Sequence, residues 1–304
     1  MQSTVVMGML FGITAAFSQS LSYIFSRAYV VRHPRAPGIL LVSSHLVMGI
    51  AALVVLPFAW SPDVPPLRAY IWPLLGTAMF YATGQAGFFL LMQRIGASRV
   101  APLLGFKIVL LAVIAVLFMG ESLSPRQGVA VLLCFGATMV LGYSGGRLAP
   151  ASVGYLLTAC LGYSLSDLNI QVLTRSLEPL SRIHAAVYGA AATYVLCGLV
   201  AAGAALFLRR RVLADWHIAV PFAAAWFVGM IFLFACFGTV GAVFGNILQS
   251  MRGLMSVIIS ALLVQRGMEH LDDKMSRGLL LRRLATAALM TLAIVLYVTA
   301  RPAG

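Results

Sequence analysis

GNILQSMRGLMSVIISALL, residues 245–263, is an apolar stretch long enough to enter a membrane, and it carries Arg252 near its middle. A guanidinium group stays charged at physiological pH, and burying one near a bilayer centre costs at least about 2.5–3.5 kcal/mol. At helical spacing Arg252 shares a face with four polar residues, Asn246, Gln249, Ser256 and Ser260. Lipid offers these groups no hydrogen-bond partner, so this face is expected to meet protein or a water-filled cavity.

A second cation, Lys107, lies in the middle of an earlier apolar stretch, 98–118, and 145 residues before Arg252. That separation is close to half of the 304-residue chain. Charges inside a membrane usually serve function, so we predict that both cations face one central cavity from the two halves of a duplicated carrier. The alternative for either cation is a structural ion pair with Asp167.

Composition assigns the chain to the membrane proteins. Hydrophobic residues make up 61% of it and charged residues only 10%, whereas soluble domains carry about 25% charged residues. The net charge of +13 comes from basic residues scattered among loops, a topology signal that predicts no nucleic-acid partner. The four cysteines lie singly in apolar stretches, without the spacing of a metal site or a disulfide framework.

A membrane-spanning helix needs about 20 mostly apolar residues. Ten stretches meet this requirement, and Pro and Gly punctuate most of the connections between them. The expected helices are 4–29, 38–58, 71–92, 97–119, 126–143, 152–175, 182–207, 216–237, 241–264 and 279–300. The predicted fold class is therefore all-α integral membrane with ten transmembrane helices.

The two halves of the chain resemble each other. The segment 17–20, Phe-Ser-Gln-Ser, corresponds to 163–166, Tyr-Ser-Leu-Ser, at an offset of 146 residues, and the two cations correspond at 145. Five helices per copy is an odd number, so the second copy enters the membrane from the opposite side. We therefore predict two inverted five-helix repeats, 1–150 and 151–304, with the binding site near the midplane between them.

The stretch 97–141 starts with small residues before a Pro-containing fourth helix, and Gly120-Glu121-Ser122-Leu123 then leads into a Gly-bearing fifth helix. In these features it resembles the end of an EamA repeat of the drug/metabolite transporter superfamily. The second half departs from that pattern, because Arg266-Gly267-Met268-Glu269 and a longer acidic loop replace the compact turn. The resemblance implies a secondary carrier that works by alternating access, without specifying a substrate.

The distribution of basic residues and the usual topology of the resembling family predict opposite orientations of the chain in the membrane. The connections after the first, third, fifth, seventh and ninth expected helices carry fourteen Lys and Arg residues, against five on the other side of the membrane. The positive-inside rule places the fourteen in the cytoplasm and both termini outside. Members of the resembling family usually keep both termini inside, and an inverted-repeat carrier works in either orientation.

Polar residues on several expected helices are candidates for the site. Substrate contact is predicted for residues on both halves of the chain: Arg252, Lys107, Gln249, Asn246, Ser256, Ser18, Ser22, Tyr81, Gln85, Ser164 and Gln171. Asp167 either carries a coupling proton or balances one of the cations. His45 is the histidine well inside an expected helix, where it either bonds to a neighbour or relays protons.

Two cations and one carboxylate leave one net positive charge, which favours an anionic or carboxylate-bearing substrate. We predict a multi-pass carrier in the cell inner membrane for a small anionic or zwitterionic metabolite, with proton or counter-substrate coupling, as a monomer or homodimer. The alternatives are a broad drug or amino-acid exporter, a lipid-linked phosphate carrier, and, from other classes, an intramembrane enzyme or a scaffold. The sequence lacks Walker A and HExxH motifs, and no cofactor, metal or catalytic residue is predicted.

Overall fold

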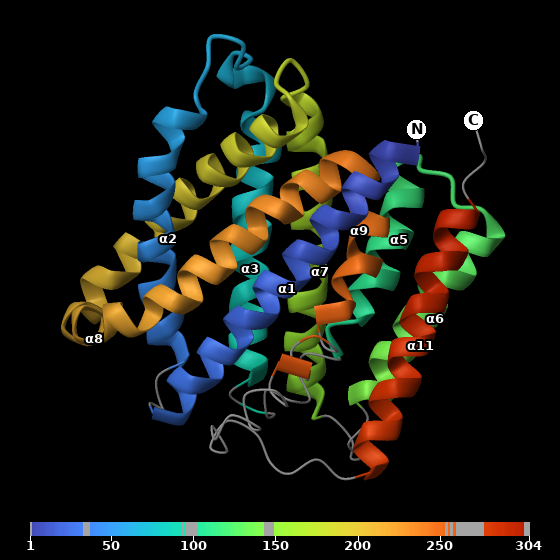
Figure 1. The fold of residues 1–304 in the computed structure, drawn as a ribbon. Coiled ribbons are helices and arrows are strands. Elements are labelled where there is room, and N and C mark those ends of the chain that lie inside the picture. The colour runs from blue at the N-terminus through green and yellow to red at the C-terminus, as the bar shows by residue number, and fades with distance from the viewer. Residues whose placement is uncertain are drawn as a thin grey trace.

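The protein is a bundle of helices in a computed structural model that describes residues 2–32, 37–92, 94, 103–142, 149–252, 255, 258–259 and 277–300. Every regular element in these ranges is a helix (Figure 1). The first half contains α1 (Gln2–Arg32), α2 (Pro37–Ala59), the short 3-10 helix η1 (Leu67–Ala69), α3 (Ile71–Met92), α5 (Phe106–Met119) and α6 (Pro125–Gly142). The second half contains α7 (Pro150–Ser176), α8 (Arg182–Val240), α9 (Ala242–Gln249) and α11 (Arg277–Thr299).

Five described segments are long and apolar enough to cross a membrane: Ser3–Ser26, Gly38–Ala59, Ile71–Leu91, Arg182–Leu208 and Trp216–Val240. Shorter apolar helices cover Phe106–Met119, Pro125–Val140 and Ala288–Thr299. The 27-residue α7 is also long enough, but its polar side chains lower its hydropathy. The all-helical membrane class predicted from the sequence is confirmed, and these helices are consistent with ten crossings.

The outer surface of the bundle is apolar, as lipid requires. Phe58 and Phe207 are 86% and 90% exposed, which a soluble surface would rarely allow for side chains of this size. Trp60 and Trp72 flank the connection between α2 and α3, and Trp216 begins the second crossing of α8 at the other end of the bundle. Exposed tryptophans at both ends of the helices are typical of the two membrane interfaces.

The sequence predicted separate helices over 182–207 and 216–237, but the structure forms one helix, α8, of 59 residues. In Figure 1 α8 runs down beside α2, turns at the lower left and returns past α3 and α1, so it still crosses twice. The connecting residues 208–215, LRRRVLAD, contain neither Gly nor Pro, and most of them favour helix. The chain therefore has no local signal that would end the helix between the two crossings.

The two cation-bearing helices, expected as continuous over 97–119 and 241–264, are each interrupted close to the cation. A turn at Leu104 and Gly105 precedes α5, and α9 ends at Gln249 with a turn at Ser250. The second interruption has a visible cause, because the side chain of Ser250 bonds to the carbonyl of Ile247, and a carbonyl occupied in this way favours a bend in the helix. Broken helices near a midplane site are typical of secondary transporters.

Four long helix pairs build the bundle. Helix α2 packs on α8, α3 on α7, α1 on α8, and α6 on α11, while α5 and α9 meet in the centre and also contact α7 and α1. Figure 1 shows α6 and α11 side by side at one edge of the molecule. Helix α8 contributes the largest share of the buried side chains in the main core, followed by α9 and α5.

The contact between α2 and α8 depends on Gly49 and Gly198. A Cβ atom added to Gly49 would lie 2.7 Å from the Cα atom of Gly198, closer than carbon atoms tolerate. We expect Gly49→Ala to lower the free energy of unfolding by about 1–3 kcal/mol, because it forces the two backbones apart. Thermal unfolding in detergent measures this effect.

Gly203→Ala is the matched control, since a Cβ atom added to Gly203 on the same helix α8 meets no atom within 4 Å. This change should leave stability unchanged or raise it by up to about 1 kcal/mol through helix propensity. Equal losses in the two variants would contradict the close α2–α8 contact.

Candidate functional site

A buried ion pair lies where α5, α7 and α9 meet. Lys107 Nζ lies 2.8 Å from Asp167 Oδ2, and Nδ2 of Asn246 donates to the same oxygen over 2.8 Å. All three side chains are buried. Asn246 Nδ2 also donates to the carbonyl of Ala242 on its own helix. One carboxylate oxygen therefore joins three helices from distant parts of the sequence.

The local structure explains why Lys107 needs this partner. It is the second residue of α5, where the positive end of the helix dipole disfavours a cation. Asp167 offsets that effect, and the ring of Tyr163, with its centroid 5.6 Å from Nζ, adds a cation–π contact. The sequence left open whether Asp167 balances a cation, and in this structure it neutralises Lys107. A direct part for Lys107 in substrate binding stays a prediction.

Arg252 is placed differently. Its Nη1 donates to Oε1 of Gln19 on α1 over 2.7 Å, and its Nε donates to the carbonyl of Gln249 over 3.1 Å. Its side chain is half-buried, and no carboxylate among the described residues lies within ion-pair distance of it. Arg252 also lies within electrostatic range of Lys107 and Tyr163. The two cations thus lie near each other, and only Lys107 has an acidic partner in the described part of the chain.

Serine hydroxyls cross between the halves to reach the backbone of each cation. Ser20 on α1 donates to the carbonyl of Arg252 over 3.0 Å, and Ser164 on α7 donates to the carbonyl of Lys107 over 3.1 Å. Each hydroxyl bonds to a backbone carbonyl close to the point where a cation-bearing helix is interrupted. The same type of bond therefore supports both cation-bearing segments.

Two predicted serines on α1 lie apart from this arrangement. Ser22 donates to the carbonyl of Gln19 on its own helix over 2.7 Å. Ser18 is buried against Gly229 on α8. The structure therefore places Gln19 and Ser20, rather than Ser18 and Ser22, in contact with Arg252. Ser256, also predicted at this site, lies outside the described residues.

Gln171 connects α7 to both neighbouring segments one turn beyond Asp167. Its Nε2 donates to Oε1 of Glu121 over 2.7 Å, and its Oε1 accepts from the backbone N–H of Ala242 over 2.6 Å. Gln171 is fully buried. Its contacts join α7 to the start of α9 and to the connection after α5, on the side of Asp167 toward the end of the bundle where α1 begins and α11 ends (Figure 1).

A polar cleft of about 530 Å³ lies on the outer side of Gln171, between the ends of α5, α7, α8 and α11 and the start of α9. Its lining includes one acidic and one basic side chain, Glu121 and Arg175, together with Gln127 and the glycines at 238 and 241. The cleft and the buried ion pair are thus on opposite sides of the Gln171 contacts.

A second buried polar cluster lies between α2, α3 and α8. The Nδ1 atom of His45 lies 2.8 Å from the carbonyl of Leu41, so Nδ1 carries the proton and Nε2 accepts from the hydroxyl of Tyr81 over 3.2 Å. Tyr81 in turn accepts from Nε2 of Gln85 and from the hydroxyl of Tyr194. The donor of each bond in this cluster is therefore assigned. Nδ1 of His45, Nε2 of Gln85 and the hydroxyls of Tyr81 and Tyr194 donate.

The same cluster continues to Trp226, whose indole N–H donates to the hydroxyl of Tyr194 over 2.7 Å. The ring of Tyr81 also lies 6.4 Å from that of Tyr163, which contacts Lys107. The predicted residues His45, Tyr81 and Gln85 are therefore brought together and linked through aromatic rings to the buried ion pair. The alternative in which His45 bonds to a neighbour describes this structure, and a relay role stays a prediction.

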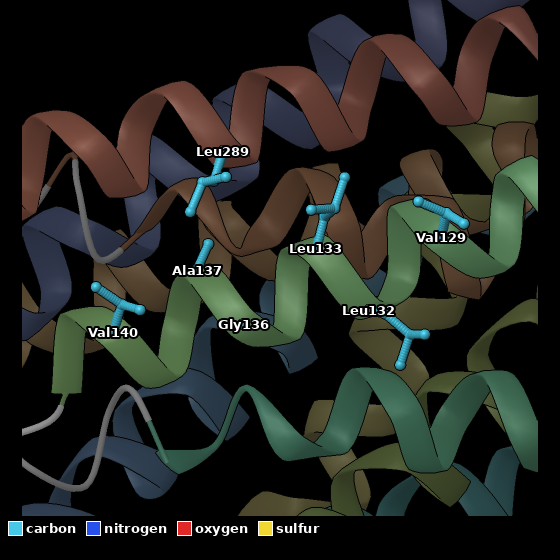
Figure 2. Close-up of a pocket in the computed structure, with 7 residues that line it drawn as sticks. All are labelled: Val129, Leu132, Leu133, Gly136, Ala137, Val140 and Leu289. Carbon is cyan, nitrogen blue, oxygen red and sulfur yellow. The ribbon is translucent and has the colours of Figure 1, made fainter.

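A groove of about 330 Å³ between α6 and α11 contains aliphatic side chains only (Figure 2). Its lining residues are Val129, Leu132, Leu133, Gly136, Ala137, Val140 and Leu289. Such a lining suits a lipid chain and offers nothing to orient a polar molecule. In the described part of the chain no group of three or more His, Cys, Asp or Glu side chains is placed to hold a metal ion.

Comparisons with known proteins agree with the membrane fold. Residues 6–143 match the model of the EamA-like transporter family. Among solved structures, a crystal structure described only as that of a protein has a TM-score of 0.60 and 17% sequence identity, and the alignment covers 97% of this chain and 98% of that chain. At this identity the likeness shows the fold alone. The search of curated proteins found no matching relative.

Proposed function

We propose that this chain, which matches the EamA-like transporter family over residues 6–143, is a secondary active transporter for a small anionic or zwitterionic metabolite in the cell inner membrane. The match supports a multi-pass membrane transporter of the drug/metabolite transporter superfamily. The observation that carries the finer proposal is Arg252, a half-buried cation without a carboxylate partner among the described residues. Its planar guanidinium suits a carboxylate or phosphate group.

The charges of the site favour an anion. Asp167 neutralises Lys107, which leaves the charge of Arg252 to be balanced. The partner of Arg252 in this structure is the neutral amide of Gln19. A substrate carboxylate would replace a neutral acceptor by a charged one and can accept two parallel hydrogen bonds from the planar guanidinium. A cationic drug would meet net repulsion at the same place.

The packing of the helices supports the proposed duplication into 1–150 and 151–304. The helices are numbered here as the ten expected crossings. The first crossing packs on the eighth, and the sixth packs on the third. The second packs on the seventh, the fourth on the ninth, and the fifth on the tenth. This pattern arises when each crossing corresponds to the one five later. The bonds from Ser20 and Ser164 to the carbonyls of the two cations repeat it at the level of side chains.

Alternating access requires that one side of the site be closed. We assign Gln171 and its contacts to Glu121 and Ala242 as the gate between the site and the polar cleft. The protein described here is then closed toward the end that carries the start of α1 and the end of α11. Rocking of one repeat against the other would open it.

The gate gives a labelling prediction. Gln171→Ala removes two hydrogen bonds, one of them to a carboxylate, which together are worth about 2 kcal/mol. We expect a roughly thirtyfold faster reaction of an impermeant maleimide with Ile247→Cys, a buried position on α9. The measurement uses a background in which the four native cysteines, all buried and free, are replaced by alanine.

Thr158→Ala serves as the control for the labelling experiment. Thr158 lies on the exposed side of α7, and its hydroxyl donates to the carbonyl of Gly154 on the same helix. This change should leave the labelling rate unaltered. An unaltered rate in Gln171→Ala as well would contradict the assignment of the gate.

The proposed substrate class is tested by thermal unfolding of the purified protein with a panel of small anions, zwitterions, lipophilic cations and lipid-linked phosphates. A ligand that binds the folded state stabilises it, by about 2.7 kcal/mol at a hundred times its Kd. We expect small anions or zwitterions to raise the unfolding temperature. Stabilisation by lipophilic cations alone would favour a drug exporter, and stabilisation by lipid-linked phosphates alone would favour a lipid carrier.

A further inference from the structure

Two side chains on α9 hold buried carbonyl oxygens that accept no hydrogen bond within the described part of the chain. They are Oδ1 of Asn246 and Oε1 of Gln249, which belong to side chains only 1% and 2% exposed. Buried acceptors are normally paired, so an unpaired one calls for an explanation, such as a missing ligand. Both of these oxygens belong to the helix that leads directly to Arg252.

The orientation of both amides is fixed by their other contacts. Nδ2 of Asn246 lies 2.8 Å from Asp167 Oδ2 and 2.9 Å from the carbonyl of Ala242, and Nε2 of Gln249 lies 3.3 Å from the carbonyl of Gly12. All three neighbours are acceptors. Rotating either amide by half a turn would bring two oxygens together, so the exchange of N and O that often makes amides ambiguous does not apply.

The two oxygens are near the charged groups of the site. Asn246 and Gln249 are three residues apart, so they lie on the same side of α9. Asn246 touches the carboxylate of Asp167, and the carbonyl of Gln249 accepts from Nε of Arg252. The two unpaired acceptors therefore belong to side chains next to Asp167 and on the helix whose last backbone carbonyl holds Arg252, the residue that the proposed function assigns to the anionic group of the substrate.

We propose that Asn246 and Gln249 form a donor-recognition pair, which requires the substrate to carry an N–H or O–H group beside its carboxylate. Arg252 holds the carboxylate, while the ammonium or hydroxyl on the neighbouring carbon donates to Asn246 Oδ1 and Gln249 Oε1. This inference rests on the proposed function and narrows it from anions in general to amino and hydroxy acids. A site with unpaired acceptors rejects an analogue that lacks the donor, because the acceptors then stay buried and unsatisfied.

The test compares carboxylates that differ only in this group. One set is alanine, lactate and propionate, and a larger set is phenylalanine, phenyllactate and phenylpropionate. Affinities for the purified wild-type protein are measured by ligand-dependent thermal unfolding. In at least one set, the amino or the hydroxy acid should bind at least about tenfold more tightly than the plain carboxylate. Whichever of the two binds more tightly identifies the preferred donor.

Gln249→Met tests the residue itself, because methionine keeps the length of the side chain and removes its acceptor. The ratio of affinities between donor-bearing and plain carboxylates should fall at least about threefold. A general loss of stability would lower the affinity for all ligands of a set alike and would leave the ratio of affinities unchanged. Ser43→Ala is the matched control, since Ser43 is also buried and unpaired but lies on α2, which packs against α8.

Two results would overturn the inference. The first is equal affinity for all members of both sets, which would mean that water satisfies the two oxygens in the bound state. The second is an unchanged ratio in Gln249→Met. Failure of every carboxylate to bind the wild-type protein would instead overturn the proposed function, and this inference with it.

Discussion

Proteoliposomes that carry the Arg252→Gln variant are expected to transport the anionic substrate at least about tenfold more slowly than the wild-type protein. The change removes charge-assisted hydrogen bonds worth about 1.5–3 kcal/mol, and each 1.4 kcal/mol corresponds to a factor of ten. The fold should survive, because glutamine can still donate to Oε1 of Gln19. The initial rate of uptake of a labelled substrate, at equal protein content, measures the effect.

Two further variants sharpen that result. Arg252→Lys keeps the charge and loses the planar fork, so its rate should lie between those of the wild type and the glutamine variant. Arg68→Gln removes an exposed arginine of η1 at the end of the bundle and should transport normally. Equal rates for Arg252→Gln and Arg68→Gln would show that the buried guanidinium does not hold the substrate.

The Asp167→Asn variant is expected to be destabilised by about 3–5 kcal/mol. It leaves the ammonium group of Lys107 buried without a counter-charge, and loss of one partner of a buried pair is costly for that reason. The oxygen that accepts from Asn246 is retained, so the effect reports on the charge. Chemical unfolding in detergent measures it, with Asp63→Asn in the exposed connection after α2 as the control.

The double variant Lys107→Met/Asp167→Asn separates charge from packing. Removing both charges should restore most of the stability, since neutral replacements of a buried ion pair are often tolerated. If the single variant Asp167→Asn were as stable as Asp63→Asn, the ion pair would have no part in holding α5 against α7. A double variant no more stable than the single one would mean that Asp167 acts through shape or through Asn246.

Several features could be predicted from the sequence because they follow from desolvation. A charge in an apolar stretch must find a partner or water, which is why Lys107, Arg252 and Asp167 were expected to lie close together in the structure. Ser164 and Gln171, two polar residues that were predicted to face the site, are buried on α7 together with Asp167. Apolar length gave the crossings, and the all-helical class followed from them.

Other features depend on tertiary contacts that leave little trace in the sequence. Ser20 was not among the predicted serines, Ser18 and Ser22, and it reaches Arg252 only because α9 ends nearby. Gln19 was not predicted either, and its partner Arg252 lies 233 residues away in the sequence. The continuous α8 was missed because apolar length indicates where crossings end and does not show whether the helix itself ends there.

The central claim is that Arg252 supplies the positive charge that binds the substrate, and equilibrium binding tests it most directly. The anion that most strongly stabilises the wild-type protein is titrated into the wild-type, Arg252→Gln and Arg68→Gln proteins. The account predicts equal affinity for the wild-type and Arg68→Gln proteins, with binding to Arg252→Gln weaker by at least about tenfold. Undiminished affinity in a correctly folded Arg252→Gln protein would contradict it.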